Sequence, residues 1–140
     1  REFERIGNMS ANLNNMRLLE KVEKIESLIH AADVGVLFTQ SEGISNSILE
    51  CMACGKPVLA SDAGGTREII EDNETGFLIA DQNGSKAEEI ISRLLESDVL
   101  RHEVGRKARA LIESRFALDG MGKNFEGLYQ TLQIRSGQKM

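Results

Sequence analysis

Two short apolar runs, each followed by a polar loop and then by a helix-like stretch, constrain the fold of this chain more than any other feature. The first run covers residues 34–39 and the second covers residues 58–61, and a third follows at residues 77–79. Continuous apolar runs of this length are typical of strands that are buried on both faces of a sheet. Strands that alternate with helices through short turns predict right-handed βαβ crossovers and a parallel sheet.

Apolar residues at helical spacing fill the rest of the chain. The expected helices cover residues 14–32, residues 46–54, the stretch behind a capping box at residues 85–88, residues 99–115, and the stretch from about residue 121 to a frayed tail at residues 135–140. A length of 140 residues suits one domain. We therefore expect residues 1–140 to form a single α/β domain, a Rossmann-like parallel sheet flanked by helices.

Composition excludes several classes of partner. Lys and Arg number 17 against 22 Asp and Glu, a net charge of −5, which argues against nucleic acid and against a polybasic membrane surface. Aromatic residues make up 4% and there is no Trp, which disfavours stacking on bases. No apolar run is long enough to span a bilayer, and no secretory signal is present. These features predict a cytoplasmic protein, which could still bind a small anion through backbone N–H groups.

The two cysteines, Cys51 and Cys54, have the C-x-x-C spacing of thioredoxin-type and metal sites. A redox pair of this kind lies at a helix N-terminus, whereas this one falls late in a helix that ends at Gly55. Neither histidine has a recognisable ligand spacing with the pair. We expect packing rather than redox chemistry or metal binding.

The loops that leave the first two strands mark the candidate site. They are residues 40–45 and residues 62–66, and loops that follow neighbouring parallel strands lie at the edge where open α/β sheets bind ligands. The helix beginning near Asn46 would direct its unpaired N–H groups and positive dipole end towards this edge. No G-x-G-x-x-G follows a strand, and Gly55-Lys56 lacks the Walker pattern and precedes a strand. The sequence therefore supports neither a nicotinamide or flavin cofactor nor a P-loop.

Two glutamates stand out near the same edge. Glu42 lies in the first loop, and Glu50 follows eight positions later, one turn into the helix. A carboxylate can accept hydrogen bonds from neighbouring hydroxyl groups. Two carboxylates beside a helix N-terminus would suit a diphosphate with a hydroxylated ring at each end, such as a nucleotide sugar. Taken alone, the two glutamates are more simply explained as solvent-facing side chains, because surface glutamates are common.

The stretch from residue 32 to residue 79 resembles the donor-binding domain of retaining family 4 glycosyltransferases, which have the two-domain GT-B fold. The resemblance rests on ADVGVLFTQSEG at residues 32–43, on the E-x7-E pair within EGISNSILECMACGKPVLASDAGGTREII at residues 42–70, and on NETGFLI at residues 73–79. It implies that the chain is an incomplete C-terminal domain of such an enzyme.

The resemblance also implies a role for particular residues. The implied donor site consists of Glu42, Gly43, Ile44, Ser45, Asn46, Ser47, Glu50, Gly64 and Gly65. Glu42 matches the catalytic carboxylate that contacts the transferred sugar near the reacting carbon, and Glu50 matches the one that holds the ribose. The backbone of residues 44–46 would cap the diphosphate, and Ser47 would add a side-chain contact. The two glycines match a loop where the backbone passes close to the donor.

The implied reaction moves a sugar from a nucleotide diphosphate sugar to an acceptor with retention, without a metal or other cofactor. The implied partners are this donor and the acceptor-binding N-terminal domain of the same parent chain. Family members carry an Arg and a Lys at the start of the donor domain, ahead of the region matched here. From residue 42 to residue 68 the sequence has two cationic side chains, Lys56 and Arg67, and four anionic side chains. The isolated chain is therefore expected to be inactive.

Other departures from the family concern the sugar pocket and the sheet. Ile44 and Ser45 replace a commoner Phe-Gly-type pair, which would change the shape of the sugar pocket. Residues 1–7 resemble the third strand of the family's domain, so two central strands would precede the chain. The strand at residues 34–38 would then have an open edge, covered by a second copy in a homodimer or by the first residues folding back.

Two other functions fit the same residues. The chain could be a non-catalytic nucleotide-sugar binding module that kept the fold and lost the chemistry, or part of a nucleotide-sugar epimerase of GT-B shape. Family members often act on glycolipids or growing polysaccharides, which would place the parent protein at the cytoplasmic face of the inner membrane.

Overall fold

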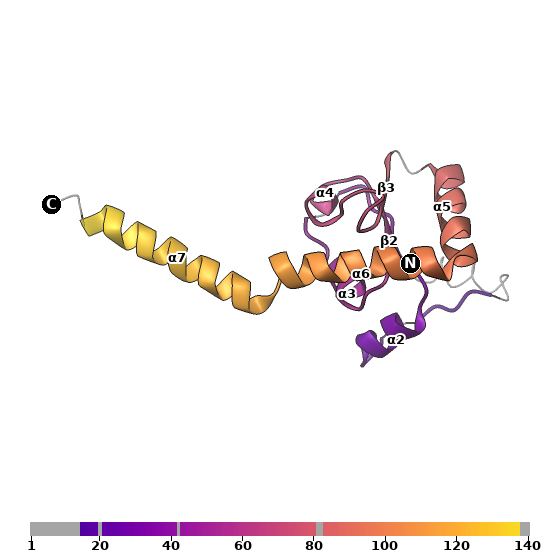
Figure 1. Ribbon diagram of the computed structural model, residues 1–140, viewed down its shortest axis with the longest axis horizontal. Helices are drawn as coiled ribbons and strands as arrows, with labels where there is room; N and C mark the ends of the chain where they lie inside the picture. The colour runs from indigo at the N-terminus through magenta and orange to yellow at the C-terminus, as the bar shows by residue number, and fades with distance from the viewer. Residues whose placement is uncertain (1–14, 20, 42, 81–82, 138–140) are drawn as a thin grey trace.

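The computed structural model describes residues 15–137, apart from residues 20, 42, 81 and 82 (Figure 1). Residues 1–7, which were compared with a third strand, lie outside this range. The elements in chain order are α2 (Ile25–Ala31), β1 (Gly35–Leu37), α3 (Asn46–Ala53), β2 (Val58–Ser61), α4 (Thr66–Ile69), β3 (Phe77–Ile79), α5 (Gly84–Glu96), α6 (Asp98–Arg115) and α7 (Leu118–Gly137).

The three strands form one parallel sheet in the order β1-β2-β3. Gly35 pairs with Val58, and Leu59 pairs with Phe77. This arrangement confirms the predicted alternation, with α3 connecting β1 to β2 and α4 connecting β2 to β3. All four residues of β2 are buried, as expected for the central strand. Within the described chain β1 has one unpaired edge, and its Val36 is 48% exposed.

Each face of the sheet carries its own apolar core, because successive side chains of a strand point to opposite faces. Val58 and Ala60 of β2 pack with α3 and α6, and Leu59 packs with α5. The first core contains Ile48, Met52, Val58, Ala60, Ile69, Ile70, Ala108 and Ile112. The second contains Leu59, Phe77, Ile79, Ala87, Ile90, Leu94 and Val104. Because α6 contributes to both cores, it fastens the two layers together.

Helix α6 approaches the rest of the molecule closely at Gly105. A Cβ atom at this position would lie 2.0 Å from the carbonyl oxygen of Gly55, in the turn that ends α3. Gly55 itself has φ +70°, a conformation that side-chain-bearing residues rarely adopt. Both glycines are therefore required for α6 to lie against this turn.

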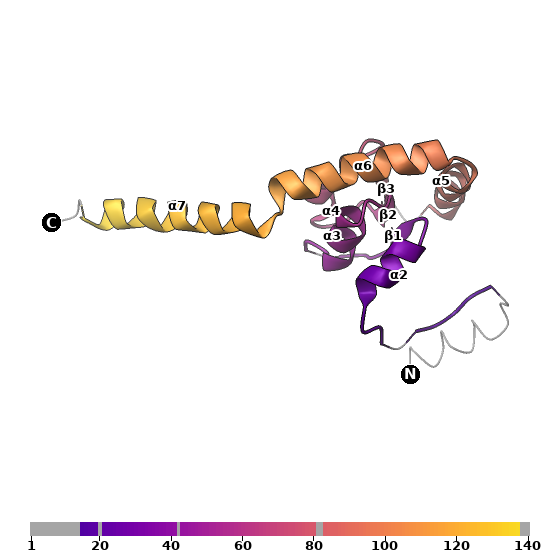
Figure 2. The ribbon, with the colours of Figure 1, turned by 60° about the horizontal axis from the view of Figure 1, so that its bottom comes forward.

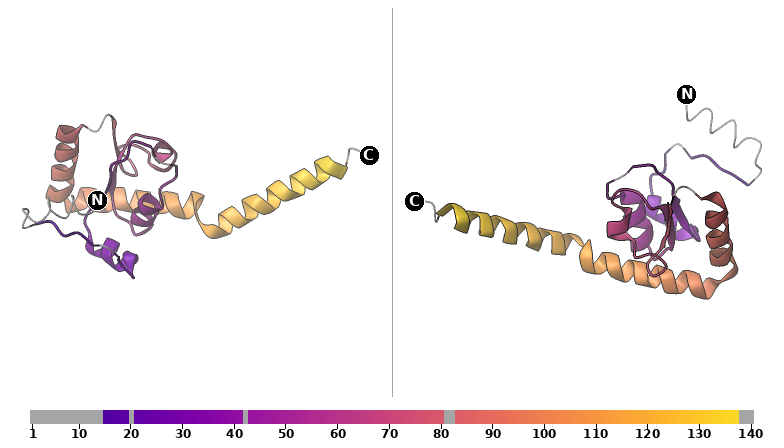
Figure 3. Two further views of the ribbon diagram at one scale, coloured as in Figure 1. Left: turned by 180° about the vertical axis from the view of Figure 1, so that it is seen from behind. Right: turned by 90° about the horizontal axis from the view of Figure 1, so that it is seen from above.

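Helix α7 continues from α6 and extends away from the body of the molecule (Figures 1 and 3). It begins three residues before the predicted start at about residue 121, and it runs through Gly137 into the stretch expected to fray. Its described apolar side chains are about half exposed, namely Phe125, Leu128, Tyr129 and Leu132.

Two sequence-based expectations about helix starts are wrong. Among the described residues of the helix expected over residues 14–32, only Ile25–Ala31 are helical, where α2 lies against α3 (Figure 2). Leu19, which precedes the helical part, is 53% exposed, so the packing of its side chain would stabilise a helix there very little. The second error concerns α5, which is capped by Asn83 and not by Ser85, because the Asn83 side chain accepts a hydrogen bond from the backbone N–H of Lys86.

Candidate functional site

The loops that leave β1 and β2 touch at the carboxyl edge of the sheet. A Cβ atom on Gly65 would lie 2.8 Å from the carbonyl oxygen of Gly43 and 3.2 Å from the backbone nitrogen of Ile44. Gly64, beside it, has φ +57°. The structure therefore brings together the two loops that were predicted to meet at this edge, and Gly65 is required for their contact.

Buried hydroxyl groups fix both loops to the ends of the strands. The backbone N–H of Thr39 donates to Oγ of Ser61 at 3.0 Å, which ties the end of β1 to the end of β2. Oγ1 of Thr66 lies 2.8 Å from the carbonyl oxygen of Ser61 and accepts from the N–H of Ala63 at 3.2 Å. Thr66 is fully buried. These contacts hold the turn between β2 and α4 in one shape.

Helix α3 begins at this edge with Ser45 as its N-cap residue. The carbonyl oxygen of Ser45 accepts the helix hydrogen bond from the N–H of Leu49, so the N–H groups before Leu49 have no partner of this kind. The Ser45 side chain is buried but makes no capping hydrogen bond, and the first turn holds no acidic residue. Asn46 and Ser47 are exposed. The start of α3 can therefore accept an anion without repulsion from its own first turn.

Glu50 is exposed on α3, four positions after Asn46. Residues at this spacing are neighbours on one helix face, so Glu50 lies one turn from the start of the helix. Glu42, the other carboxylate of the predicted pair, lies outside the described residues. The separation of the two carboxylates is thus still a prediction.

An ion pair between Asp62 and Arg67 was not anticipated from the sequence. Nε and Nη2 of Arg67 donate to the two carboxylate oxygens of Asp62, the second at 2.6 Å. The hydrogen bond from Arg67 lowers the pKa of the Asp62 carboxyl below its usual value, and the same bond raises the pKa of Arg67. The pair spans a turn and the first residues of α4, a five-residue separation with no simple sequence signature.

Lys56, the other cation counted between residues 42 and 68, lies away from this edge. Its Nζ donates to the carbonyl oxygen of His30 at 2.9 Å. Lys56 precedes β2, so it is at the amino edge of the sheet, as expected. Arg67 is therefore the cation that this stretch contributes at the carboxyl edge.

The two cysteines are free and half-buried. Burial raises the pKa of the Cys51 thiol, and the neighbouring Cys54 adds to the shift. A Cβ atom on Gly35 would lie 2.9 Å from Sγ of Cys51, so the thiol fills the space between α3 and β1. A raised pKa is the opposite of what a reactive thiolate needs, which supports the packing role. In the described parts of the chain, no three His, Cys, Asp or Glu side chains gather as a metal site would require.

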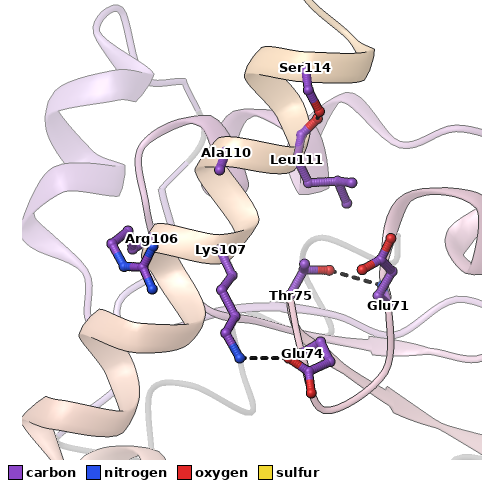
Figure 4. A pocket seen from close by; sticks show the side chains of 8 residues that line it. All are labelled: Glu71, Glu74, Thr75, Arg106, Lys107, Ala110, Leu111 and Ser114. Atoms are coloured by element: carbon purple, nitrogen blue, oxygen red, sulfur yellow. Dashed lines mark hydrogen bonds and ion pairs between the residues drawn. The ribbon is translucent and has the colours of Figure 1, made fainter.

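Hollows outside these loops include two among the described residues. One, of about 230 Å³, is lined by Phe38, Asn83, Gly84 and Ala87, between the end of β1 and the start of α5. The other, of about 350 Å³, lies between α6 and the turn before β3, where Lys107 reaches across to Glu74 (Figure 4). Because that turn precedes β3, the larger hollow is at the amino edge, away from the candidate site.

No described helix is both long enough and apolar enough to cross a membrane.

Comparisons with known proteins agree with the sequence patterns. The family described as "Glycosyl transferases group 1" matches residues 3–111. The alpha-D-kanosaminyltransferase of Streptomyces kanamyceticus is 29% identical over 112 residues, which are 80% of this chain and 29% of that protein. The N-acetyl-alpha-D-glucosaminyl L-malate synthase of Bacillus anthracis is 28% identical over 113 residues, which are 79% of this chain and 29% of that protein.

A solved structure shows the same fold. The crystal structure of Anabaena Alr3699/HepE in complex with UDP-glucose matches 93% of this chain and 36% of its own, with a TM-score of 0.82 and 24% sequence identity. The predicted fold, a parallel sheet with flanking helices as in a GT-B glycosyltransferase domain, is confirmed by this match. The chain spans about a third of the length of these proteins. Because the family match covers most of its residues, the chain belongs to the group 1 glycosyl transferases.

Proposed function

We propose that the chain is the donor-binding part of a retaining family 4 glycosyltransferase. It binds a nucleotide diphosphate sugar, and the hexosyl-type sugar passes with retention to an acceptor held by another domain of the parent chain. The observation that carries the proposal is the contact between Gly65 and the Gly43–Ile44 backbone. It joins two loops beside the start of α3, at the edge where open parallel sheets bind ligands.

Each part of the donor has a proposed partner at this edge. The diphosphate lies against the backbone of residues 44–46, with Ser47 beside it, because the first N–H groups of α3 are available for an anion. Glu50 accepts hydrogen bonds from the ribose hydroxyls. Glu42 contacts the transferred sugar near the reacting carbon. The glycine loop at Gly64 and Gly65 lies behind these groups.

Catalysis in this proposal is mainly electrostatic. Negative charge develops on the leaving diphosphate, and N–H groups already oriented towards it stabilise that charge in the transition state. No metal takes part. Further positive charge would come from the family's Arg and Lys, which belong to a part of the domain ahead of the matched region, and the acceptor site would belong to the N-terminal domain.

The setting of the parent protein follows from the same proposal. We expect it to be cytoplasmic and to work at the inner face of the membrane, where lipid-linked acceptors would be found. The unpaired edge of β1, with Val36 exposed, would be covered by a second copy of the chain or by another strand of the parent protein.

Calorimetric titration of the chain with UDP, GDP and ADP tests the donor site. We expect one of these nucleotides to bind, and Glu50→Gln to weaken that binding about tenfold, because a charge-assisted hydrogen bond to a ribose hydroxyl is lost. Glu88→Gln, which alters an exposed glutamate on α5, is the matched control and should change nothing.

Two results would contradict the proposal in different ways. If no nucleotide binds, the donor site itself is refuted. If a nucleotide binds and Glu50→Gln has no more effect than Glu88→Gln, only the ribose role of Glu50 is refuted.

A further inference from the structure

Arg67 is held in a fixed position at the carboxyl edge. Its side chain is 71% exposed, whereas that of its partner Asp62 is 16% exposed. The backbone N–H of Asp62 donates to the carbonyl oxygen of Ile79 at 2.8 Å, which anchors the backbone of Asp62 to the end of β3. Buried Thr66, the residue before Arg67, fixes the start of α4. The Arg67 side chain is therefore positioned by the backbone at one end and by the Asp62 carboxylate at the other.

An exposed ion pair of this kind contributes little to stability, because solvent screens the attraction and a long side chain must be ordered. Pairing with Asp62 nevertheless restricts the side-chain rotamers of Arg67, compared with those of an unpaired surface arginine. A guanidinium has five N–H donors, and Asp62 takes two of them, which leaves three for another acceptor. Asp62 thus leaves Arg67 able to bind a second anion.

The backbone just before Arg67 lies close to the backbone just before α3. Gly65 lies two residues before Arg67, and a Cβ atom on Gly65 would lie 3.2 Å from the backbone nitrogen of Ile44. Ile44 in turn lies two residues before the start of α3. Between residues 43 and 68 the other cation, Lys56, is bound to His30 near the opposite edge of the sheet. Guanidinium or ammonium donors from this stretch for an anion at the start of α3 can therefore come only from Arg67.

We propose that Arg67 contacts the diphosphate of the nucleotide donor, with Asp62 acting as the residue that positions it. This inference rests on the proposed donor site and adds a residue to it. The outer N–H groups of Arg67 meet the phosphate oxygens, while the inner ones stay on Asp62. Since Asp62 neutralises much of the charge of Arg67, the contact supplies oriented hydrogen bonds more than net positive charge.

Calorimetry with three ligands tests this role. The ligands are the nucleoside diphosphate that binds best, the nucleoside that lacks its phosphates, and inorganic pyrophosphate. We expect Arg67→Gln to weaken the diphosphate and pyrophosphate about tenfold and to leave the nucleoside unchanged, because the lost contact is to phosphate. Arg67→Lys should fall between Gln and the native residue, since a lysine keeps the charge but not the fork of donors.

Arg93→Gln is the matched control, because Arg93 is an exposed arginine on α5 with no ion pair among the described residues. Unfolding followed by circular dichroism should give the same midpoint for each variant as for the native chain.

The possible results distinguish a failure of the Arg67 contact from a failure of the proposed donor site. If the diphosphate binds and Arg67→Gln affects it no more than Arg93→Gln does, the inference is wrong and the donor site stands. An equal loss for nucleoside and diphosphate would mean a structural role, which also overturns the inference. If pyrophosphate binding depends on Arg67 but no nucleotide binds, the phosphate contact holds and the donor proposal fails. If neither ligand binds, both fail.

Discussion

Helices α6 and α7 follow one another and are of similar length, with 18 and 20 residues, yet they relate to the rest of the molecule in opposite ways. Helix α6 buries Val104, Ala108 and Ile112 in the two cores. Helix α7 carries an apolar stripe with the same helical spacing, but its side chains from Phe125 to Leu132 are about half exposed. The helix extends away from the body of the molecule (Figure 3). An apolar stripe thus predicts a helix, and it does not identify the surface that will cover it.

The largest difference should come from glycines in the two helices. We expect Gly105→Ala to lower the free energy of unfolding by about 3 kcal/mol, because its Cβ atom would overlap the carbonyl oxygen of Gly55 and α6 would have to move. Gly127→Ala, on α7, meets no atom within 4 Å. It should raise the helicity of α7, with a gain of about 0.5–1 kcal/mol within that helix.

Urea unfolding followed by far-ultraviolet circular dichroism measures both changes. Equal effects of the two substitutions would show that α6 does not depend on its contact with the Gly55 turn.

A smaller difference is expected for apolar side chains. Ile112→Ala removes a buried side chain from the first core and should cost about 2–3 kcal/mol, because it leaves a cavity between α6 and the sheet. Leu128→Ala, at an exposed position of α7, should stay within about 0.5 kcal/mol of the native chain. The same unfolding experiment checks both values. A cost for Leu128→Ala as large as that for Ile112→Ala would mean that α7 is covered in solution, and the contrast between the helices would be lost.

The smallest effect concerns an ion pair that fastens α6 to the turn before β3. Nζ of Lys107 donates to Glu74 at 2.6 Å (Figure 4). It also pairs with Glu103 at 3.2 Å. The hydrogen bonds that Lys107 donates to Glu74 and Glu103 raise the pKa of Lys107. A raised folded-state pKa means that this stabilisation is present at pH values below the ordinary lysine value and disappears as the pH rises through the folded value.

We therefore expect Glu74→Gln to lower the Tm slightly at neutral pH and not at all at strongly alkaline pH, with salt reducing the neutral-pH effect. Glu126→Gln, an exposed glutamate of α7, is the control. A loss of Tm from Glu74→Gln that is independent of both pH and salt would rule out the ion pair as its cause.

The sheet could be predicted from the sequence because its strands are mostly apolar. Residues 34–39, 58–61 and 77–79 have no regular polar alternation, which predicts burial on both faces, and the parallel order follows from the helices between them. The predicted burial is confirmed for the central strand β2 and is wrong for β1, where Val36 is 48% exposed. The meeting of the two loops at the carboxyl edge follows from the same topology. This part of the site was predictable because it depends on the backbone.

Other features depend on contacts that a sequence does not display. The extent of α2 is set by what it can pack against, and only its Ile29 is buried. The cap of α5 is Asn83 because the helix begins one residue before Ser85. The approach of Gly105 to Gly55 joins positions 50 residues apart. The pairing of Asp62 with Arg67 requires the particular turn between β2 and α4. Each of these is a consequence of tertiary structure.

The exposed stripe of α7 contains Tyr129, which is 63% exposed, and the chain has no other tyrosine and no tryptophan. Intrinsic ultraviolet emission from this protein therefore originates on the projecting helix. The tyrosine fluorescence would change when another molecule binds to α7, and it would change very little when the two cores unfold.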